Sequence, residues 1–239
     1  MTMGNYHSGD REIGRSDTML VSTAYLPPID YMAVLTRFRD VVIEQHETYP
    51  KQSWRNRCRI VTASGVQDLS IPVSRPRGRH SKTGEVMIKP SGPWRGKHWR
   101  AIRSAYGKAP YFAYYEDLFA PLFLEKHSAT GEVPLITFNE HLLTAVFRCL
   151  GVPVRLSKTA SFLKNPVSLH DLRDRFSPKA SRQHPATFSG WPGYHQVFSD
   201  RLGFIPNASV IDLIFHLGPD SLHYLKGIDC GRLPPGIPS

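Results

Sequence analysis

The stretch TMLVSTAYLPPIDYMAVLTRFRDVVIEQHETY, residues 18–49, decides the fold. Its first part, residues 18–26, is an apolar and β-branched run that predicts a buried strand, which two prolines end. Residues 29–38 carry apolar side chains at helical spacing, and residues 40–49 predict a second strand. A strand, a short helix and a strand within about 30 residues form a βαβ unit, so we expect the two strands to be parallel.

The rest of the chain adds a hairpin and then helices. Residues 55–73 form two alternating runs around a Ser-Gly turn, which predicts a β-hairpin. Residues 207–219 predict a helix with Asn207 as its N-cap, whereas residues 152–190 lack periodicity and predict an ordered but irregular segment. We therefore predict an α/β fold: a mixed sheet with an N-terminal βαβ unit and a β-hairpin, followed by a mostly helical C-terminal half.

The length of 239 residues suits one domain with a sizeable core. We predict a flexible N-terminal tail over residues 1–17, a single α/β domain over residues 18–226 and a C-terminal tail over residues 227–239. No stretch approaches the roughly 20 apolar residues that cross a bilayer, and the polar N-terminus lacks the apolar part of a signal peptide. We expect no membrane span.

Cysteine usage and charge suggest the compartment and the partner. The three cysteines lie far apart without a CxxC pair, so they form neither a disulfide framework nor a zinc site, and a cytoplasmic location is expected. The net charge is +10. From Lys51 to Lys108 the chain has 14 Lys or Arg against two acids, a net +12, so the remainder sums to −2. Such a basic block implies an anionic partner, or else only a solvated face.

Polar side chains gather where the second predicted strand ends. Ligands of parallel sheets bind beyond the carboxyl ends of the strands. Glu44 and His46 are two residues apart on one side of that strand, and either could act as a general base. Basic and amide side chains that could hold the negative groups of a substrate follow at Lys51, Arg55, Asn56 and Arg57. The alternative is that Glu44 only pairs with Arg55 or Arg57 across the sheet.

Further candidates lie at the end of the first strand and on two predicted helices. Tyr25 and Asp30 would line the same pocket. His98 lies on the apolar face of its helix, where a hydrogen-bonded core histidine and a catalyst are equally consistent readings. Ser209 lies at a predicted helix N-terminus, where anions bind, and we expect Asp212, inside an apolar run, to pair with an arginine of the basic block.

Cofactor and metal motifs are absent from the sequence. There is no Walker loop and no GxGxxG pattern, so the cofactor remains unknown. Glu44 and His46 resemble half of a metal site that His98 or Asp212 could complete. Because no His or Cys spacing is diagnostic, we predict no metal.

Several blocks occur in an order and spacing that resemble one protein family. They are AYLPPIDYM (24–32), YPKQSWRNRCRI (49–60), HWRAIRSAYGKAPYF (98–112) and YHQVFSDRLGFIPNASVIDLIFHLGP (194–219). Together they resemble the WbqC-like proteins over roughly residues 18–226, and the branch common in Bacteroidetes in particular. The resemblance implies a role linked to O-antigen and surface-polysaccharide gene clusters, with amino-acid or acyl transfer suggested, and implies no established catalytic residues.

The predicted function is a transferase acting on an anionic substrate such as a phosphate, a nucleotide or a nucleotide sugar, and the family resemblance implies a role in surface polysaccharide biosynthesis. A nucleic-acid-binding protein that uses the basic segment 51–108 is one alternative. A non-catalytic partner of envelope-assembly enzymes is another, which an exposed aromatic patch of Tyr111, Phe112, Tyr114 and Tyr115 would favour.

Overall fold

The structure is a computed structural model of the chain. It describes residues 17–90, 92–124, 133–166, 169–173, 175–183, 188 and 190–230. Most of the two predicted tails lies outside the described residues.

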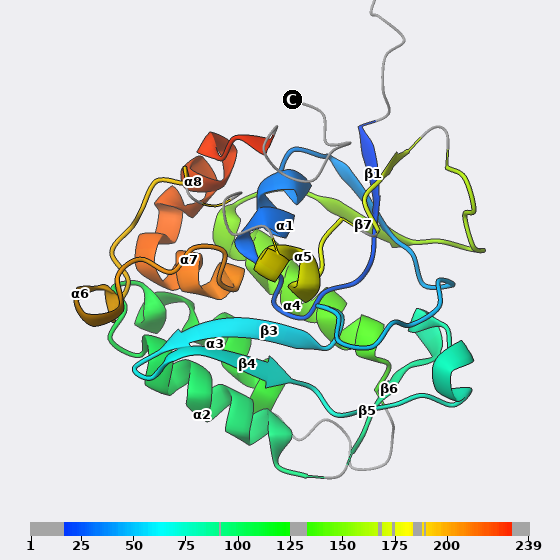
Figure 1. Ribbon diagram of the computed structural model, residues 1–239, viewed down its shortest axis with the longest axis horizontal. Helices are drawn as coiled ribbons and strands as arrows, with labels where there is room; N and C mark the ends of the chain where they lie inside the picture. Colours follow the sequence, from blue (N-terminus) through cyan, green and yellow to red (C-terminus); the bar gives the residue numbers. More distant parts are fainter. Residues whose placement is uncertain are drawn as a thin grey trace, which may run out of the picture.

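The predicted βαβ unit is confirmed at the N-terminus (Figure 1). Strand β1 (Thr18–Val21) leads to helix α1 (Ile29–Leu35) and then to strand β2 (Asp40–Ile43). The two strands pair in parallel, with Val21 opposite Ile43. All seven residues of α1 are buried. Apart from Asp30 they are apolar or aromatic, so apolar side chains occupy every face of this helix. Both strands are shorter than the apolar runs that predicted them, and the residues after each strand end form loops.

Two further strands extend this unit into a four-stranded parallel sheet with the order β7-β2-β1-β8. Strands β7 (Arg155–Lys158) and β8 (His170–Asp171) both come from the segment predicted to be irregular, so that prediction was wrong at these residues. They were missed because β7 reads RLSK and β8 has only two residues, and neither shows apolar alternation.

The predicted hairpin is also confirmed, and it forms a sheet of its own. Strands β3 (Arg57–Thr62) and β4 (Gly65–Ser70) pair antiparallel. Strands β5 (Val73–Ser74) and β6 (Met87–Ile88) form a second small antiparallel pair. The α/β organisation with parallel and antiparallel pairs is therefore as predicted, but the two kinds of pairing lie in separate sheets.

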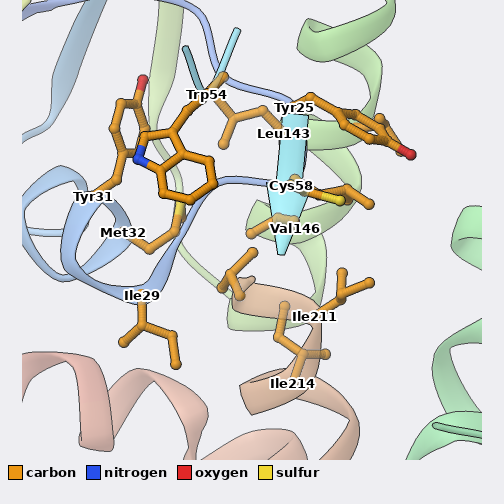
Figure 2. Packing of buried hydrophobic residues seen from close by; sticks show 14 of the residues in the cluster. Tyr25, Ile29, Tyr31, Met32, Trp54, Cys58, Leu143, Val146, Ile211 and Ile214 are labelled. Atoms are coloured by element: carbon orange, nitrogen blue, oxygen red, sulfur yellow. The ribbon is translucent and has the colours of Figure 1, made fainter. Parts of the chain in front are cut away.

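The helices follow as the sequence predicts and enclose one apolar core. The α-helices after β6 are α2 (Trp94–Tyr106), α3 (Phe112–Leu124), α4 (Leu135–Leu150), α5 (Pro178–Gln183), α6 (Ser199–Leu202), α7 (Val210–Leu217) and α8 (Ser221–Gly227). Short 3-10 helices occupy Gly78–His80, Thr83–Glu85 and Gly218–Asp220. Figure 2 shows Cys58 of β3 among side chains of α1, α4 and α7, with Tyr31 and Trp54 at the end of the cluster away from Ile214. No helix in the described ranges combines the length and apolar content that would cross a membrane.

The helix boundary at Asn207 differs from the prediction. Helix α7 begins at Val210, and Asn207 lies before it with a left-handed φ of 53°. Its side-chain Oδ1 accepts a hydrogen bond from the main-chain N–H of Asp30 at 2.8 Å. Asn207 therefore caps the first turn of α1 instead of the helix that follows it, because α1 and α7 pack together at their N-terminal ends.

Arg37 links helix α1 to helix α8 by hydrogen bonds. The Arg37 guanidinium, just after α1, donates to the carbonyls of Lys226 at 3.0 Å and Ile228 at 2.8 Å. It also donates to the carbonyl of Ala33 in α1 itself. The carbonyls of Lys226 and Ile228 at the end of α8 would otherwise lack hydrogen-bond partners within the helix. Arg37 therefore joins the end of α1 to the end of α8.

Candidate functional site

A small cleft opens at the carboxyl edge of the parallel sheet, between the ends of β1 and β8. The chain leaves β1 toward α1 and β2, and β8 lies on the other side of β1. The region beyond the carboxyl ends of the strands is where ligands of open α/β sheets bind. The cavity volume of the cleft is about 10 Å³, which is room for roughly one water molecule. It is lined by Ser22, Thr23, Ala24, Tyr31, Trp54, Arg55, Leu172, Arg173 and Phe176.

One wall of the cleft is a compact hydrogen-bonded group of Ser22, Glu47 and Arg55. Arg55 Nε and Nη2 lie 2.9 and 2.7 Å from Glu47 Oε1, a buried ion pair. Arg55 Nη2 also donates to Ser22 Oγ at 2.6 Å. Ser22 Oγ is 3.0 Å from Glu47 Oε2, and the Thr83 hydroxyl is 3.4 Å from Glu47 Oε1. The serine hydroxyl therefore contacts both a carboxylate and a guanidinium.

The opposite wall is Arg173, which follows β8. Its Nη1 donates to Glu44 Oε2 at 3.2 Å, and its Nε and Nη2 donate to Asp171 at 2.8 and 2.6 Å. The main-chain carbonyl of Arg173 lies 3.0 Å from Ser22 Oγ, which joins the two walls. The guanidinium also stacks over the ring of Phe162, 5.2 Å from its centroid. Two arginines thus approach one cleft from different parts of the chain.

Burial sets the electrostatics of the cleft. Loss of hydration raises the pKa of Glu47, and the nearby Arg55 guanidinium partly offsets this. The hydrogen bonds to Asp171 raise the pKa of Arg173, so this guanidinium stays charged. Each arginine is paired with a carboxylate, and the side chains of both arginines are less than a tenth exposed. Two guanidinium groups therefore meet three carboxylates at this cleft, those of Glu47, Glu44 and Asp171.

Glu44 and His46 lie at this edge as predicted, with different partners. Glu44 is fully buried and accepts four hydrogen bonds: from the main-chain N–H groups of His46 and Leu163, from the Thr159 hydroxyl, and from Arg173. The alternative of a pair with Arg55 or Arg57 is wrong, because Arg55 pairs with Glu47 instead. With both oxygens occupied, Glu44 is placed to hold β2 against the segment around Thr159. A catalytic role for Glu44 or His46 stays a prediction.

The other predicted residues of this edge do not line the cleft. Lys51 is exposed, and Asn56 donates to the carbonyl of Ile71 within the hairpin region. Arg57 lies on β3 and is 3.6 Å from Asp68 of β4. Among the eleven predicted site residues, Arg55 alone lines the cleft.

Tyr25 and His98 form a pair inside the core. The Tyr25 hydroxyl and His98 Nδ1 are 2.9 Å apart, and both residues are buried. Burial lowers the pKa of His98 to about 4, so its imidazole is neutral at pH 7. Of the two readings of His98 left open by the sequence, the geometry matches the hydrogen-bonded core histidine.

Asp212 forms a second buried cluster, and the predicted arginine partner is wrong. Its Oδ1 accepts from the Tyr194 hydroxyl at 2.7 Å and from Gln196 Nε2 at 2.9 Å. His216, one turn further along α7, lies 3.5 Å away. Uncharged donors therefore replace the expected guanidinium, because the segment before α7 packs its polar side chains over this helix. Burial and the nearby carboxylate raise the pKa of Tyr194.

Asp30 and Ser209 lie where α1 and α7 begin. Asp30 Oδ1 accepts from the main-chain N–H of Tyr31 at 2.7 Å, and burial raises the pKa of Asp30 to about 6. Ser209 donates its hydroxyl to the carbonyl of Leu26 at 2.8 Å. Ser209 therefore joins the start of α7 to the segment before α1, whereas the Asp30 contact stays within α1, and neither residue lines the cleft.

Sequence reasoning missed Ser22 and Arg173, which line the cleft, and Glu47, which binds Arg55 and contacts Ser22. Glu47 follows Glu44 by three residues beyond the same strand, a signal that was present in the sequence. Ser22 directly follows β1, at the same level of the sheet edge. Arg173 carried no usable signal, because β8 could not be recognised. In the described part of the chain, no group of three or more His, Cys, Asp or Glu side chains could hold a metal ion.

These features define an α/β protein with a charged cleft at the carboxyl edge of a small parallel sheet. Residues 23–175 match the WbqC-like protein family, and since this range covers more than half of the chain, the chain belongs to that family. The match establishes the family and leaves the Bacteroidetes branch a prediction. A relative is the "Uncharacterized protein Rv1507c" of Mycobacterium tuberculosis (strain ATCC 25618 / H37Rv). It is 27% identical over 230 residues, which cover 87% of this chain and 96% of the relative. No solved structure matches.

Proposed function

We propose that this chain is a transferase that holds the anionic group of a phosphate, nucleotide or nucleotide-sugar substrate in the cleft between β1 and β8. The observation that carries the proposal is the approach of Arg55 and Arg173 to one cleft at the carboxyl edge of the sheet. Guanidinium groups bind phosphate and carboxylate with paired hydrogen bonds. The cleft has a cavity volume of about 10 Å³, so its lining side chains would have to move apart to admit the charged head group, and the rest of the substrate would lie outside.

We extend the proposal to the biosynthetic role of this activity and to its cellular compartment. The family link to surface-polysaccharide clusters supports a role in building such polymers. Three buried free cysteines, Cys58, Cys149 and Cys230, are consistent with work in the cytoplasm, where nucleotide-linked donors are made.

Ligand binding by matched variants tests the proposal. The wild-type protein is titrated calorimetrically with phosphate, pyrophosphate, nucleoside diphosphates and nucleotide sugars. Arg173→Lys keeps the charge of the cleft but removes the paired donors, so we expect about tenfold weaker binding of the best ligand. Arg57→Lys makes the same change on the hairpin and should leave the affinity unchanged. Equal affinities in all three proteins would refute the site.

Nucleic-acid binding is a second candidate, which one surface favours. Helix α2 exposes Lys97, Arg100 and Arg103, and Lys108 follows just after it. Arg103 is 4.0 Å from Glu116, a weak and exposed contact. A single-stranded oligonucleotide should then bind with an affinity that falls steeply with salt, and a Lys97→Gln/Arg100→Gln double variant should reduce the salt slope by about two. Binding that does not change with salt would exclude this surface.

The third alternative, a non-catalytic partner with an exposed aromatic patch, receives less support. Only Tyr114 of the four aromatic residues is largely exposed, at 77%. Phe112 and Tyr115 are buried, and Tyr111 is packed against the core.

A further inference from the structure

The hydroxyl of Ser22 contacts both a carboxylate and a guanidinium at the cleft. It directly follows β1 and lines the cleft. Its Oγ lies 3.0 Å from a carboxylate oxygen of Glu47 and 2.6 Å from a guanidinium nitrogen of Arg55. A nucleophile within hydrogen-bond reach of a base, which other groups hold in place, is the general signature of covalent catalysis.

The orientation of the base is also fixed. Both Nε and Nη2 of Arg55 hold Glu47 Oε1, and the Thr83 hydroxyl lies beside the same atom. The other oxygen, Oε2, is the one that faces Ser22. The single hydrogen of the Ser22 hydroxyl can point to Glu47 or to the carbonyl of Arg173, at equal distances of 3.0 Å. A substrate that approaches Arg173 would select between these two positions.

We propose that Ser22 is the nucleophile of this site, that Glu47 is its general base, and that the acyl donor carries an anionic leaving group, such as an acyl phosphate. This inference rests on the proposed function and names the reacting group. Burial raises the pKa of Glu47, which brings a carboxylate closer to the range suited to proton transfer near pH 7.

The reaction balances with the groups present. Ser22 Oγ attacks the carbonyl carbon while its proton passes to Glu47, and a bond from oxygen to carbon forms. The bond from that carbon to the leaving group breaks, and the leaving group departs with the electron pair beside Arg55 or Arg173, taking the proton from Glu47. An amine or hydroxyl acceptor then attacks the Ser22 ester. Glu47 accepts the acceptor's proton and returns it to Ser22 Oγ as the ester bond breaks.

Acetyl phosphate is the probe, because it is small and its leaving group is an anion. The full-length protein is incubated with it, and acetylated peptides are identified by mass spectrometry over time. We expect a serine ester at Ser22 that is lost in Ser22→Ala. Glu47→Gln should slow its formation about 100-fold, which is the usual contribution of a general base.

Two controls keep the test decisive. Ser199 lies 3.2 Å from His195 Nδ1 and is not among the residues that line the cleft, so Ser199→Ala should leave the Ser22 ester unchanged. If Glu47→Gln fails to fold, the pH dependence of the wild-type reaction replaces it: the rate should fall as Glu47 is protonated. Acetylation of Ser199 in place of Ser22, or of Ser22 at a rate independent of pH, would overturn the assignment. Ligand binding that still depends on Arg173 would then leave the proposed function standing.

Discussion

Two regions of the molecule bury a carboxylate, and they do so in opposite ways. At the carboxyl edge of the sheet, Glu47 is matched by the guanidinium of Arg55 beside a cleft. Within α7, Asp212 is fully buried and accepts hydrogen bonds from the neutral donors Tyr194 and Gln196, with His216 nearby. A buried ion pair is costly to assemble and more costly to break, whereas hydrogen bonds to neutral groups tolerate loss of the charge. The stability of the Glu47 pair therefore depends on the charge of both partners, whereas the Asp212 cluster depends on hydrogen bonds that an uncharged side chain can also make.

The largest expected effect comes from breaking the ion pair. Arg55→Ala leaves Glu47 buried without a cation, so we expect the free energy of unfolding to fall by about 3–5 kcal/mol. The double variant Arg55→Met/Glu47→Leu removes both charges and should recover most of that loss. Urea unfolding of the three proteins measures both values. A double variant as unstable as Arg55→Ala would show that packing, and not charge, holds this wall together.

A buried carboxylate without a cation should behave in the opposite way, and Asp30 provides the case. Its pKa is raised to about 6 by burial, so the folded protein binds a proton more tightly than the unfolded chain does. The stabilising contribution of this proton is complete below about pH 4 and is lost as pH rises through 6. Asp30→Asn removes the charged form and should stabilise the protein at pH 7.5 by up to about 3 kcal/mol.

Thermal unfolding of wild type and Asp30→Asn across pH 4 to 8 tests this, because other titrating groups cancel in the difference. The two melting temperatures should converge at the acid end. A difference that does not change with pH would mean that Asp30 stays charged in the fold.

Asp212→Asn sharpens the comparison from the other side. The amide oxygen can still accept from the Tyr194 hydroxyl and Gln196, so we expect a loss of only about 1 kcal/mol. Chemical denaturation with fluorescence detection measures it. A loss as large as that of Arg55→Ala would make Asp212 part of a charged pair with His216 and end the contrast.

The smallest effect is expected on the surface. Arg57 and Asp68 are 3.6 Å apart and partly exposed, and such pairs contribute little. Arg57→Gln should change the free energy of unfolding by less than about 0.5 kcal/mol. A larger loss in the same urea titration would show that the hairpin depends on this contact and would remove Arg57 as a control.

The sequence predicts well what depends on local pattern. The βαβ unit, the hairpin and the end of α4 at Gly151, which has a left-handed φ of 65°, all follow from spacing and turn residues. Strands β7 and β8 do not follow, because the segment RLSK and a two-residue segment become strands only through the partners that pair with them. The four-stranded sheet was therefore predictable only in its central pair.

The candidate site was predictable in place but not in membership. The carboxyl edge follows from the parallel strands, and Arg55 was predicted there. The pair of Glu44 with Arg173 joins residues 129 positions apart, on which local spacing carries no information. The partners of Asp212, Tyr194 and Gln196, are much nearer in sequence, but spacing along the chain does not show which polar side chain a buried carboxylate meets.

Strand β1 and helix α1 both contact parts of the chain that are made much later, which has a consequence for synthesis on the ribosome. Strand β1 can pair with β2 as soon as Ile43 is made, but Met19 pairs on the other edge with His170, about 150 residues further on, and Arg37 reaches Ile228. At typical translation speeds this interval is on the order of ten seconds. During it the nascent chain presents an apolar β1 with one unpaired edge, which is open to pairing with another chain until β8 is made.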